Sequence, residues 1–149
     1  MSKIIIRKGE KRDLAAAFAR VEELAEYEKA AKAVTTSVKT YERDYDAGWF
    51  DLLVAETEEG ENLGVMIYYN TFSTWKGRML YLEDFVVAQH ARRAGIGEKL
   101  WEALIVVARV KGCALIKWQV LDWNEPAKAF YLKNGAELEP GWENGKLFL

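Results

Sequence analysis

The chain has 149 residues, of which 50% are hydrophobic and 13% aromatic, and its 21 basic and 23 acidic side chains give a net charge of -2 at pH 7. This length predicts one domain over residues 1–149 with a sizeable core, and the near-neutral charge excludes a global basic field for nucleic acid or an anionic membrane. A single cysteine, Cys113, and a single histidine, His90, exclude an internal disulfide and disfavour a zinc centre or a histidine-based triad, so no metal is expected.

The first third of the chain alternates strand and helix signals. Residues 3–7 form a short apolar run that is typical of a strand. Apolar side chains then recur at helical spacing over residues 14–25, behind Asp13, a residue type that often caps helices. Hydroxyl residues predict the cap of a second short helix over residues 38–45, and residues 51–56 are typical of a strand. The apolar runs are too short for a signal peptide or a membrane span, so we expect a cytoplasmic protein without membrane partners.

The middle of the chain predicts an antiparallel meander. Residues 63–71 and 78–87 are rich in strand-forming side chains, and residues 72–77 join them. Residues 58–62 form a turn signal after the preceding strand. Three consecutive strands with short connections are therefore expected to pair side by side.

The last third predicts a helix, a strand and a second helix. Helical spacing returns over residues 96–108, and residues 114–120 are typical of a strand. Asn124, with a proline soon after it, marks a helix start, and Gly135 marks the end of that helix. A last β segment is expected toward Leu149. The order of elements predicts an α+β fold with layered packing on one mixed sheet.

A glycine loop lies between a predicted strand and a predicted helix. Residues 92–97 read Arg-Arg-Ala-Gly-Ile-Gly and follow an apolar run that ends at Val87. Gly95 and Gly97 have no Cβ, so the backbone can come close to a ligand. The N-terminus of the following helix offers unpaired N–H groups and a partial positive charge. The loop therefore predicts a cradle for the pyrophosphate of an anionic cofactor.

The residues around this loop narrow the choice of cofactor. A dinucleotide fingerprint needs a third glycine where Leu100 stands, and a P-loop needs a lysine and a hydroxyl directly after its last glycine. The segment instead resembles motif A of the GNAT acetyltransferases, R/Q-x-x-G-x-G/A, whose fixed positions are filled by Arg92, Gly95 and Gly97. A simple glycine cap of a helix would give the same letters.

Two adjacent carboxylates interrupt the apolar strand before the loop. Side chains alternate across a strand, so Glu83 is expected on the face of Phe85, and Asp84 on the opposite face. At most one of the two is then expected to point at a given site. The alternative is that both are ionic partners of Arg78 or Lys117 on neighbouring strands.

A second motif lies in the last predicted helix. Asn124 and the helix after it match motif B of the GNAT enzymes, A-x-x-F-Y-x-x-x-G-A, with Phe130, Tyr131, Gly135 and Ala136 at its positions. An aromatic pair that packs a helix on a sheet would explain Phe130 better than Tyr131. Both motifs occur in the expected order, which implies a GNAT-like fold with a mixed, mostly antiparallel central sheet flanked by helices on both faces.

The resemblance narrows to the diamine acetyltransferase family. It covers nearly the whole chain and is carried by residues 22–28, 74–78, 81–84 and 121–124. This family includes spermidine/spermine acetyltransferases and thialysine N-epsilon-acetyltransferases. The resemblance thus implies an acetyl-CoA-dependent N-acetyltransferase that acts on a primary amine of a small molecule.

The resemblance to the thialysine branch is the stronger. Ser73 stands where the polyamine branch tends to have an aspartate, and Ala30 and Ala31 replace acidic residues expected in that branch. A polyamine gains from each extra carboxylate, whereas a thialysine-like amino acid brings a carboxylate that would be repelled. A thialysine-like amino acid is the favoured acceptor, and a diamine or polyamine stays open.

The resemblance also implies a mechanism and a set of site residues. By this resemblance, acetyl transfer would occur directly in a ternary complex, with Glu83 as the base and Tyr131 as the acid that protonates the leaving sulfur. The residues implied to hold acetyl-CoA are Phe85, Val86, Val87, Arg92, Arg93, Ala94, Gly95, Ile96, Gly97, Glu98 and Asn124.

The acceptor side of the site is implied in the same way. Glu28 and Asp84, together with Glu83, would bind the amine end, and Tyr27 and Trp75 would form walls. A solvated helix face for Glu28 and an ordinary loop aromatic for Trp75 are the alternatives. The relatives are typically homodimers that share the acceptor site, so a homodimer is expected.

Two other functions stay open. One is acetylation of a protein lysine or N-terminus, which needs an open groove for a peptide. The other is a non-catalytic sensor that binds acyl-CoA, and the presence of both Glu83 and Tyr131 argues against it.

Overall fold

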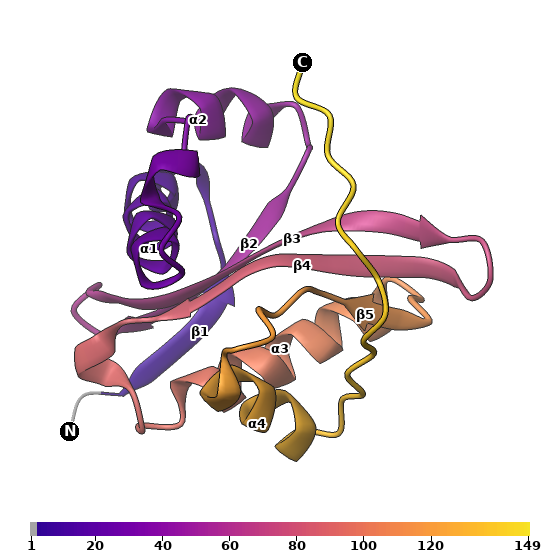
Figure 1. Ribbon diagram of the computed structural model, residues 1–149. Helices are drawn as coiled ribbons and strands as arrows, with labels where there is room; N and C mark the ends of the chain where they lie inside the picture. Colours follow the sequence, from indigo (N-terminus) through magenta and orange to yellow (C-terminus); the bar gives the residue numbers. More distant parts are fainter. Residues whose placement is uncertain (1–2) are drawn as a thin grey trace. The chain divides into compact units, whose positions relative to one another are not determined.

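The computed structural model describes residues 3–149 (Figure 1). The chain forms two compact units, Met1–Trp118 and Gln119–Leu149. The first unit contains every strand of the sheet together with helices α1, α2 and α3, and the second contains helix α4. No helix among the described residues is long and apolar enough to cross a membrane.

The sheet has the strand order β1-β2-β3-β4-β5. Neighbouring strands are antiparallel from β1 to β4, and β5 pairs with β4 in parallel. The predicted meander is confirmed, and the predicted strand over residues 114–120 forms over fewer residues. The strands are Ile4–Lys8 (β1), Asp51–Thr57 (β2), Asn62–Ser73 (β3), Gly77–Val87 (β4) and Leu115–Lys117 (β5).

The helices of the first unit cover both faces of the sheet, as predicted. Helices α1 (Leu14–Tyr27) and α2 (Val38–Asp46) lie on one face, and α3 (Ile96–Val110) lies on the other (Figure 1). On the α1 face, Leu14 and Ala17 pack into a buried cluster with apolar side chains of β2, β3 and β4. Along α3, the apolar stripe includes Leu100 and Leu104, which are fully buried.

Local capping explains where several helices begin and end. The Ser37 side chain accepts a hydrogen bond from the Thr40 amide, so the predicted cap of α2 is confirmed. In the second unit, Asn124 caps α4 (Glu125–Lys133) through the Ala127 amide. That helix ends before Gly135, whose φ of +88° favours glycine.

Asp13 is the residue directly before α1, as predicted, but the predicted side-chain cap of that helix does not form. Its side chain makes no capping hydrogen bond to α1 and instead accepts hydrogen bonds from the Arg7 guanidinium and the Glu10 amide. Arg7 lies on β1, so Asp13 ties the start of α1 to the sheet. The Arg7 guanidinium donates to both carboxylate oxygens, and this two-point ion pair explains why the side chain does not cap α1.

The predicted final β segment is also wrong. Among the described residues, no helix or strand follows Lys133. Pro140 has no N–H to donate to a ladder, and Gly141 has a φ of +101°, outside the extended region. The apolar side chains of Leu147 and Phe148 are exposed, so no buried face holds this segment in a strand.

Candidate functional site

A β-bulge in β4 places the two carboxylates. Ile67 of β3 pairs with Asp84, and the next residue, Tyr68, pairs with Leu82, so Glu83 is an extra residue with no partner in the ladder. A bulge of this kind breaks the alternation of side chains and bends the strand. Glu83 and Asp84 both line one pocket. The prediction that at most one of them points at a given site is therefore wrong.

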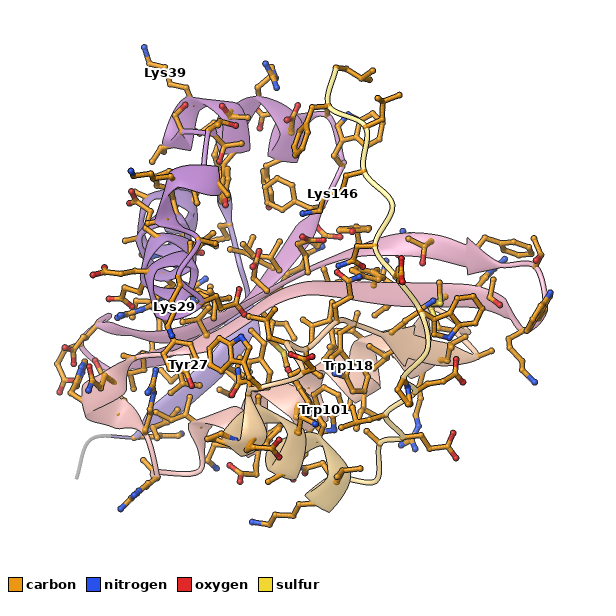
Figure 2. All side chains as sticks on the ribbon, in the orientation of Figure 1. Tyr27, Lys29, Lys39, Trp101, Trp118 and Lys146 are labelled. Atoms are coloured by element: carbon orange, nitrogen blue, oxygen red, sulfur yellow. The ribbon has the colours of Figure 1, made fainter. Side chains whose placement is uncertain are left out.

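The bulge also separates Glu83 from Phe85. Phe85 stacks on Trp101 of α3 with ring centroids 6.4 Å apart, and Trp101 meets Trp118 edge-on at 5.1 Å (Figure 2). Glu83 faces the pocket that residues of α2 help to line. The predicted shared face of Glu83 and Phe85 is wrong, because the extra residue shifts the phase of the alternation between them.

The pocket has a volume of about 500 Å³ and combines aromatic and acidic walls. None of its described lining residues is a lysine or an arginine. Such a lining suits a cationic group, which aromatic faces and carboxylates both attract. The lining residues are Thr36, Thr40, Tyr41, Asp44, Trp49, Phe50, Ile67, Tyr69, Glu83 and Asp84.

The two carboxylates differ in their hydrogen bonding and in their burial. Glu83 is exposed and accepts a hydrogen bond of 2.7 Å from the Tyr69 hydroxyl. Asp84 is half-buried, and burial, followed by the charges of Glu83 and Glu28, raises its pKa to about 7. Burial also raises the pKa of Tyr41 to about 12. A carboxyl group that titrates near neutral pH in a pocket is typical of a chemical site.

The alternative of two simple ion pairs is not what the structure shows. Among residues 3–149, neither carboxylate forms an ion pair with Arg78 or Lys117. The Arg78 guanidinium instead donates a hydrogen bond to the Lys111 carbonyl. Arg78 and Lys117 therefore do not hold this pair in place.

Of the other predicted acceptor residues, Glu28 is placed with the pair and Trp75 is not. Glu28 directly follows α1, burial raises its pKa, and its charge contributes to the raised pKa of Asp84. The alternative of a solvated face for Glu28 is thereby disfavoured. Tyr27, the last residue of α1, is 46% exposed (Figure 2). Trp75 lies in the turn between β3 and β4, is 86% exposed and does not line the pocket.

The glycine loop opens α3 as predicted. Gly95 precedes the helix with a φ of +77°, and a Cβ on it would meet nothing within 4 Å, so its backbone conformation alone calls for glycine. Arg93 also has a positive φ, +71°, which is costly for a residue with a side chain. No side-chain cap bonds the first turn of α3 at Gly95. The first-turn amides of Ile96, Gly97 and Glu98 therefore form an N-terminus that fits an anion.

Strand β4, which precedes the glycine loop, pairs with β5 over only part of its length. β5 pairs with β4 only over Met79–Tyr81, so it does not accompany the part of β4 that carries Phe85, Val86 and Val87. The Arg92 side chain donates a hydrogen bond to the Val87 carbonyl at 3.4 Å. This bond ties the loop back to the end of the strand, and Ala94 lies within the turn that follows.

The second unit carries two further predicted residues. Asn124 is buried, and its side-chain oxygen caps α4 at 3.3 Å from the Ala127 nitrogen. Tyr131 lies on α4, is 8% exposed and meets the Phe130 ring edge-on at 5.7 Å. The structure therefore gives Asn124 a structural role and leaves both the catalytic and the packing interpretations of Tyr131 open.

Several residues that line the pocket were not predicted from the sequence. Tyr41 and Asp44 come from α2, and Tyr69 comes from β3. Only Tyr69 had a usable signal, because a β3–β4 hairpin places it on the strand next to Glu83. The α2 residues reach the pocket through tertiary packing, which local patterns do not report.

Comparison with known proteins identifies the family. The model of the acetyltransferase (GNAT) family matches residues 16–136. The chain belongs to the GNAT acetyltransferase family. It is 36% identical over 146 residues to a thialysine N-epsilon-acetyltransferase of Bos taurus, covering 92% of this chain and 86% of that protein. The corresponding enzyme of Sus scrofa is 37% identical, with 91% and 85% covered.

Solved structures show the same GNAT fold at lower identity. An aminoglycoside acetyltransferase from an uncultured soil metagenomic sample superposes with a TM-score of 0.79, covers 98% of this chain and 99% of its own, and is 22% identical. An acetyltransferase of Trypanosoma brucei superposes with a TM-score of 0.76, covers 97% and 100%, and is also 22% identical. The protein is thus a GNAT acetyltransferase by sequence and by fold.

Proposed function

We propose that this acetyltransferase transfers the acetyl group of acetyl-CoA to a primary amine of a small molecule. The observation that carries the proposal is the bulged pair Glu83–Asp84 in an aromatic pocket whose described lining contains no lysine or arginine. An ammonium group would be attracted there and would find carboxylates that can accept its proton.

The favoured acceptor is a thialysine-like amino acid, with a diamine or polyamine as the other choice. The names of the relatives and the residue types at Ser73, Ala30 and Ala31 support the former. The acids of the pocket, Glu83 and Asp84 with Glu28 nearby, suit the amine end of either acceptor.

The N-terminus of α3 is the proposed site of the pyrophosphate. The left-handed conformations of Arg93 and Gly95 and the lack of a side-chain cap leave the first turn shaped for an anion. By resemblance, the backbone of Phe85 and Val87 would hold the pantetheine arm, and Asn124 would contact the cofactor. Gly97→Glu should place a carboxylate in this cradle and abolish acetyl-CoA binding measured by calorimetry, and unchanged affinity would reject the assignment.

In the proposed reaction, acetyl-CoA supplies the acetyl group as a thioester. Glu83 accepts the proton that the acceptor ammonium must lose, directly or through water. The freed nitrogen lone pair forms the C–N bond at the carbonyl carbon as the C–S bond breaks. Tyr131 donates its phenolic proton to the leaving sulfur and regains a proton, through water, from the newly acylated nitrogen, which becomes a neutral amide. Glu83 then releases its proton to solvent. No covalent bond to the protein forms at any stage.

A thiol assay for released coenzyme A tests this function. The panel is thialysine, lysine, ornithine, putrescine, spermidine and a lysine peptide, each with wild type and Tyr131→Phe. We expect thialysine-like amino acids to give the highest kcat/KM, and Tyr131→Phe to lower kcat while acetyl-CoA still binds.

Each other outcome of the panel points to a different conclusion. Preference for spermidine would assign the polyamine class, and preference for the peptide would assign a protein acetyltransferase. Acetyl-CoA binding without turnover on any amine would assign a sensor. Equal turnover in Tyr131→Phe would remove Tyr131 from the acid role. We also propose a homodimer, which light scattering showing a monomer at micromolar concentration would reject.

A further inference from the structure

Tyr69 is a pocket residue to which neither motif assigns a role. It lies on β3 in register with Tyr81 of β4, and the two rings stack with centroids 5.4 Å apart and an interplanar angle of 20°. This cross-strand pair gives the Tyr69 ring a fixed support. Its hydroxyl donates the 2.7 Å hydrogen bond to the Glu83 carboxylate.

Glu83 needs such a support because of its place in the bulge. It is the extra residue between the pairs Ile67–Asp84 and Tyr68–Leu82, so the ladder does not fix its orientation. It is also exposed, and an exposed glutamate samples many rotamers. The Glu83 side chain is held by the hydrogen bond from Tyr69, whose ring is itself held by stacking.

The same bond distinguishes Glu83 from its neighbour. Two carboxyl groups that share a pocket resist ionising together, so a hydrogen-bond donor on one of them favours its charged form and leaves the proton to the other. The groups that face the pair are Glu28 after α1, Tyr41 and Asp44 on α2, Tyr69 on β3 and Tyr81 on β4. Burial keeps the pKa of Asp84 near neutral, at about 7, which agrees with Asp84 as the member that holds the proton.

We propose that Tyr69 is a positioning residue, whose hydroxyl orients the Glu83 carboxylate toward the pocket and selects Glu83, rather than Asp84, as the group that accepts the proton of the acceptor amine. The inference rests on the proposed function, because it assigns the orientation of the base in that reaction. Tyr69 itself gives up no atom in the reaction. Its O–H bond stays intact while the amine proton passes to Glu83 and the C–N bond forms.

The first test reads the carboxylates directly and needs no turnover. Carboxyl carbons labelled with ¹³C are followed by NMR from pH 4 to pH 9, and Glu83→Gln and Asp84→Asn assign the two signals. In wild type, we expect the Asp84 carbon to carry the titration step near neutral pH almost alone. In Tyr69→Phe, the Glu83 carbon should take a clear share of that step, because the donor that favoured its charged form is gone.

Tyr81→Phe is the matched control. It removes a phenol hydroxyl from the same stacked pair but leaves the hydrogen bond between Tyr69 and Glu83 in place. The division of the titration step should then stay as in wild type. An unchanged division in Tyr69→Phe, or an equal change in both variants, would overturn the inference.

The second test connects the bond to the reaction. All variants are assayed with the same acceptor, so that the ionisation of the amine is common to them. Tyr69→Phe should lower kcat about tenfold, as expected for the loss of one hydrogen bond to a charged group. KM for the acceptor should change less, and the acid limb of kcat/KM should shift toward higher pH. A changed NMR titration with an unchanged pH profile would overturn the inference. Absence of turnover in wild type on every amine would instead reject the proposed function.

Discussion

The first unit contains two pairs of carboxylates, Asp13 with Glu56 and Glu83 with Asp84, and the two pairs differ in their surroundings. In the Arg7 cluster (Arg7, Asp13 and Glu56), the guanidinium of β1 bonds Asp13 at 2.7 Å and Glu56 at 2.8 Å. The Arg7 bonds lower the pKa of both carboxyl groups and raise that of Arg7. In the pocket pair (Glu83 and Asp84), the pocket supplies no cation among its described lining residues, and the pKa of Asp84 is raised instead.

This difference separates structural from chemical carboxylates. A carboxylate that is paired with a guanidinium stays ionised over the whole physiological range and holds elements together. One that is half-buried without a cation can take up and release protons near neutral pH. The Arg7 cluster links β1, β2 and the start of α1, whereas no ion pair within residues 3–149 includes Glu83 or Asp84. Matched substitutions in the two pairs should therefore have opposite effects on stability and on activity.

The largest effect is expected for Glu83→Gln. Loss of the base should lower kcat by about a hundredfold or more, within the range known for general bases, while stability to urea stays close to wild type. Glu56→Gln makes the same change in the Arg7 cluster and should do the reverse, with normal kcat and lower stability. Initial rates and urea titrations of both variants make the comparison. Near-normal turnover in Glu83→Gln would remove Glu83 from the base role.

The next effect is expected for Arg7→Met. It leaves the buried carboxylate of Asp13 and the half-buried carboxylate of Glu56 without their cation, and the free energy of unfolding should fall by about 2 kcal/mol. Lys11→Met, which removes the exposed pair of Lys11 with Asp46, should leave the unfolding free energy unchanged within error. Equal stabilities of the two variants in urea would show that Arg7 contributes no more than a surface cation.

Local sequence signals predicted most of the fold. Helical spacing located the helices, and the runs of strand-forming residues located the meander. Ser37 and Gly135 were interpreted correctly because a cap and a left-handed turn depend on a few neighbouring residues. The side-chain cap predicted for Asp13 does not form. The same carboxylate can bond either its own helix or a guanidinium, and the position of Arg7 depends on the sheet.

The pocket pair was located by sequence but oriented wrongly. Alternation along one strand assumes that every residue has a partner, and the bulge at Glu83 appears only when β4 is placed against β3. The walls from α2, such as Tyr41, depend on how that helix packs and have no local signal. Registers and packing are relations between distant segments, and one sequence without relatives does not specify them.

The smallest change in stability is expected for Asp84→Asn. This substitution should stabilise the protein, whereas substitutions in the Arg7 cluster should destabilise it. The folded-state pKa of Asp84, about 7, lies above the ordinary value of an aspartate, so the folded state binds its proton more tightly than the unfolded state. The contribution of Asp84 to stability is therefore largest at low pH and is lost as the pH rises from about 4 to about 7. Asp84→Asn should remove this loss and stabilise the protein at pH 8 by about 1–2 kcal/mol, a value reduced for the partial exposure of the group.

Asp13→Asn should change stability in the opposite direction to Asp84→Asn. The pKa of Asp13 is lowered by Arg7, so its contribution is present above the ordinary aspartate pKa and is lost as the pH falls. Asp13→Asn should thus destabilise the protein at pH 8 and much less at pH 3. Asp44→Asn changes a carboxylate that lines the same pocket as Asp84 but has a pKa lowered by Arg43, and it should not stabilise the protein at pH 8. Urea titrations of the variants at pH 3, pH 5 and pH 8 separate these cases. A pH-independent effect of Asp84→Asn would mean that Asp84 does not titrate in the pocket, and the contrast between the two acidic pairs would then rest on Glu83 alone.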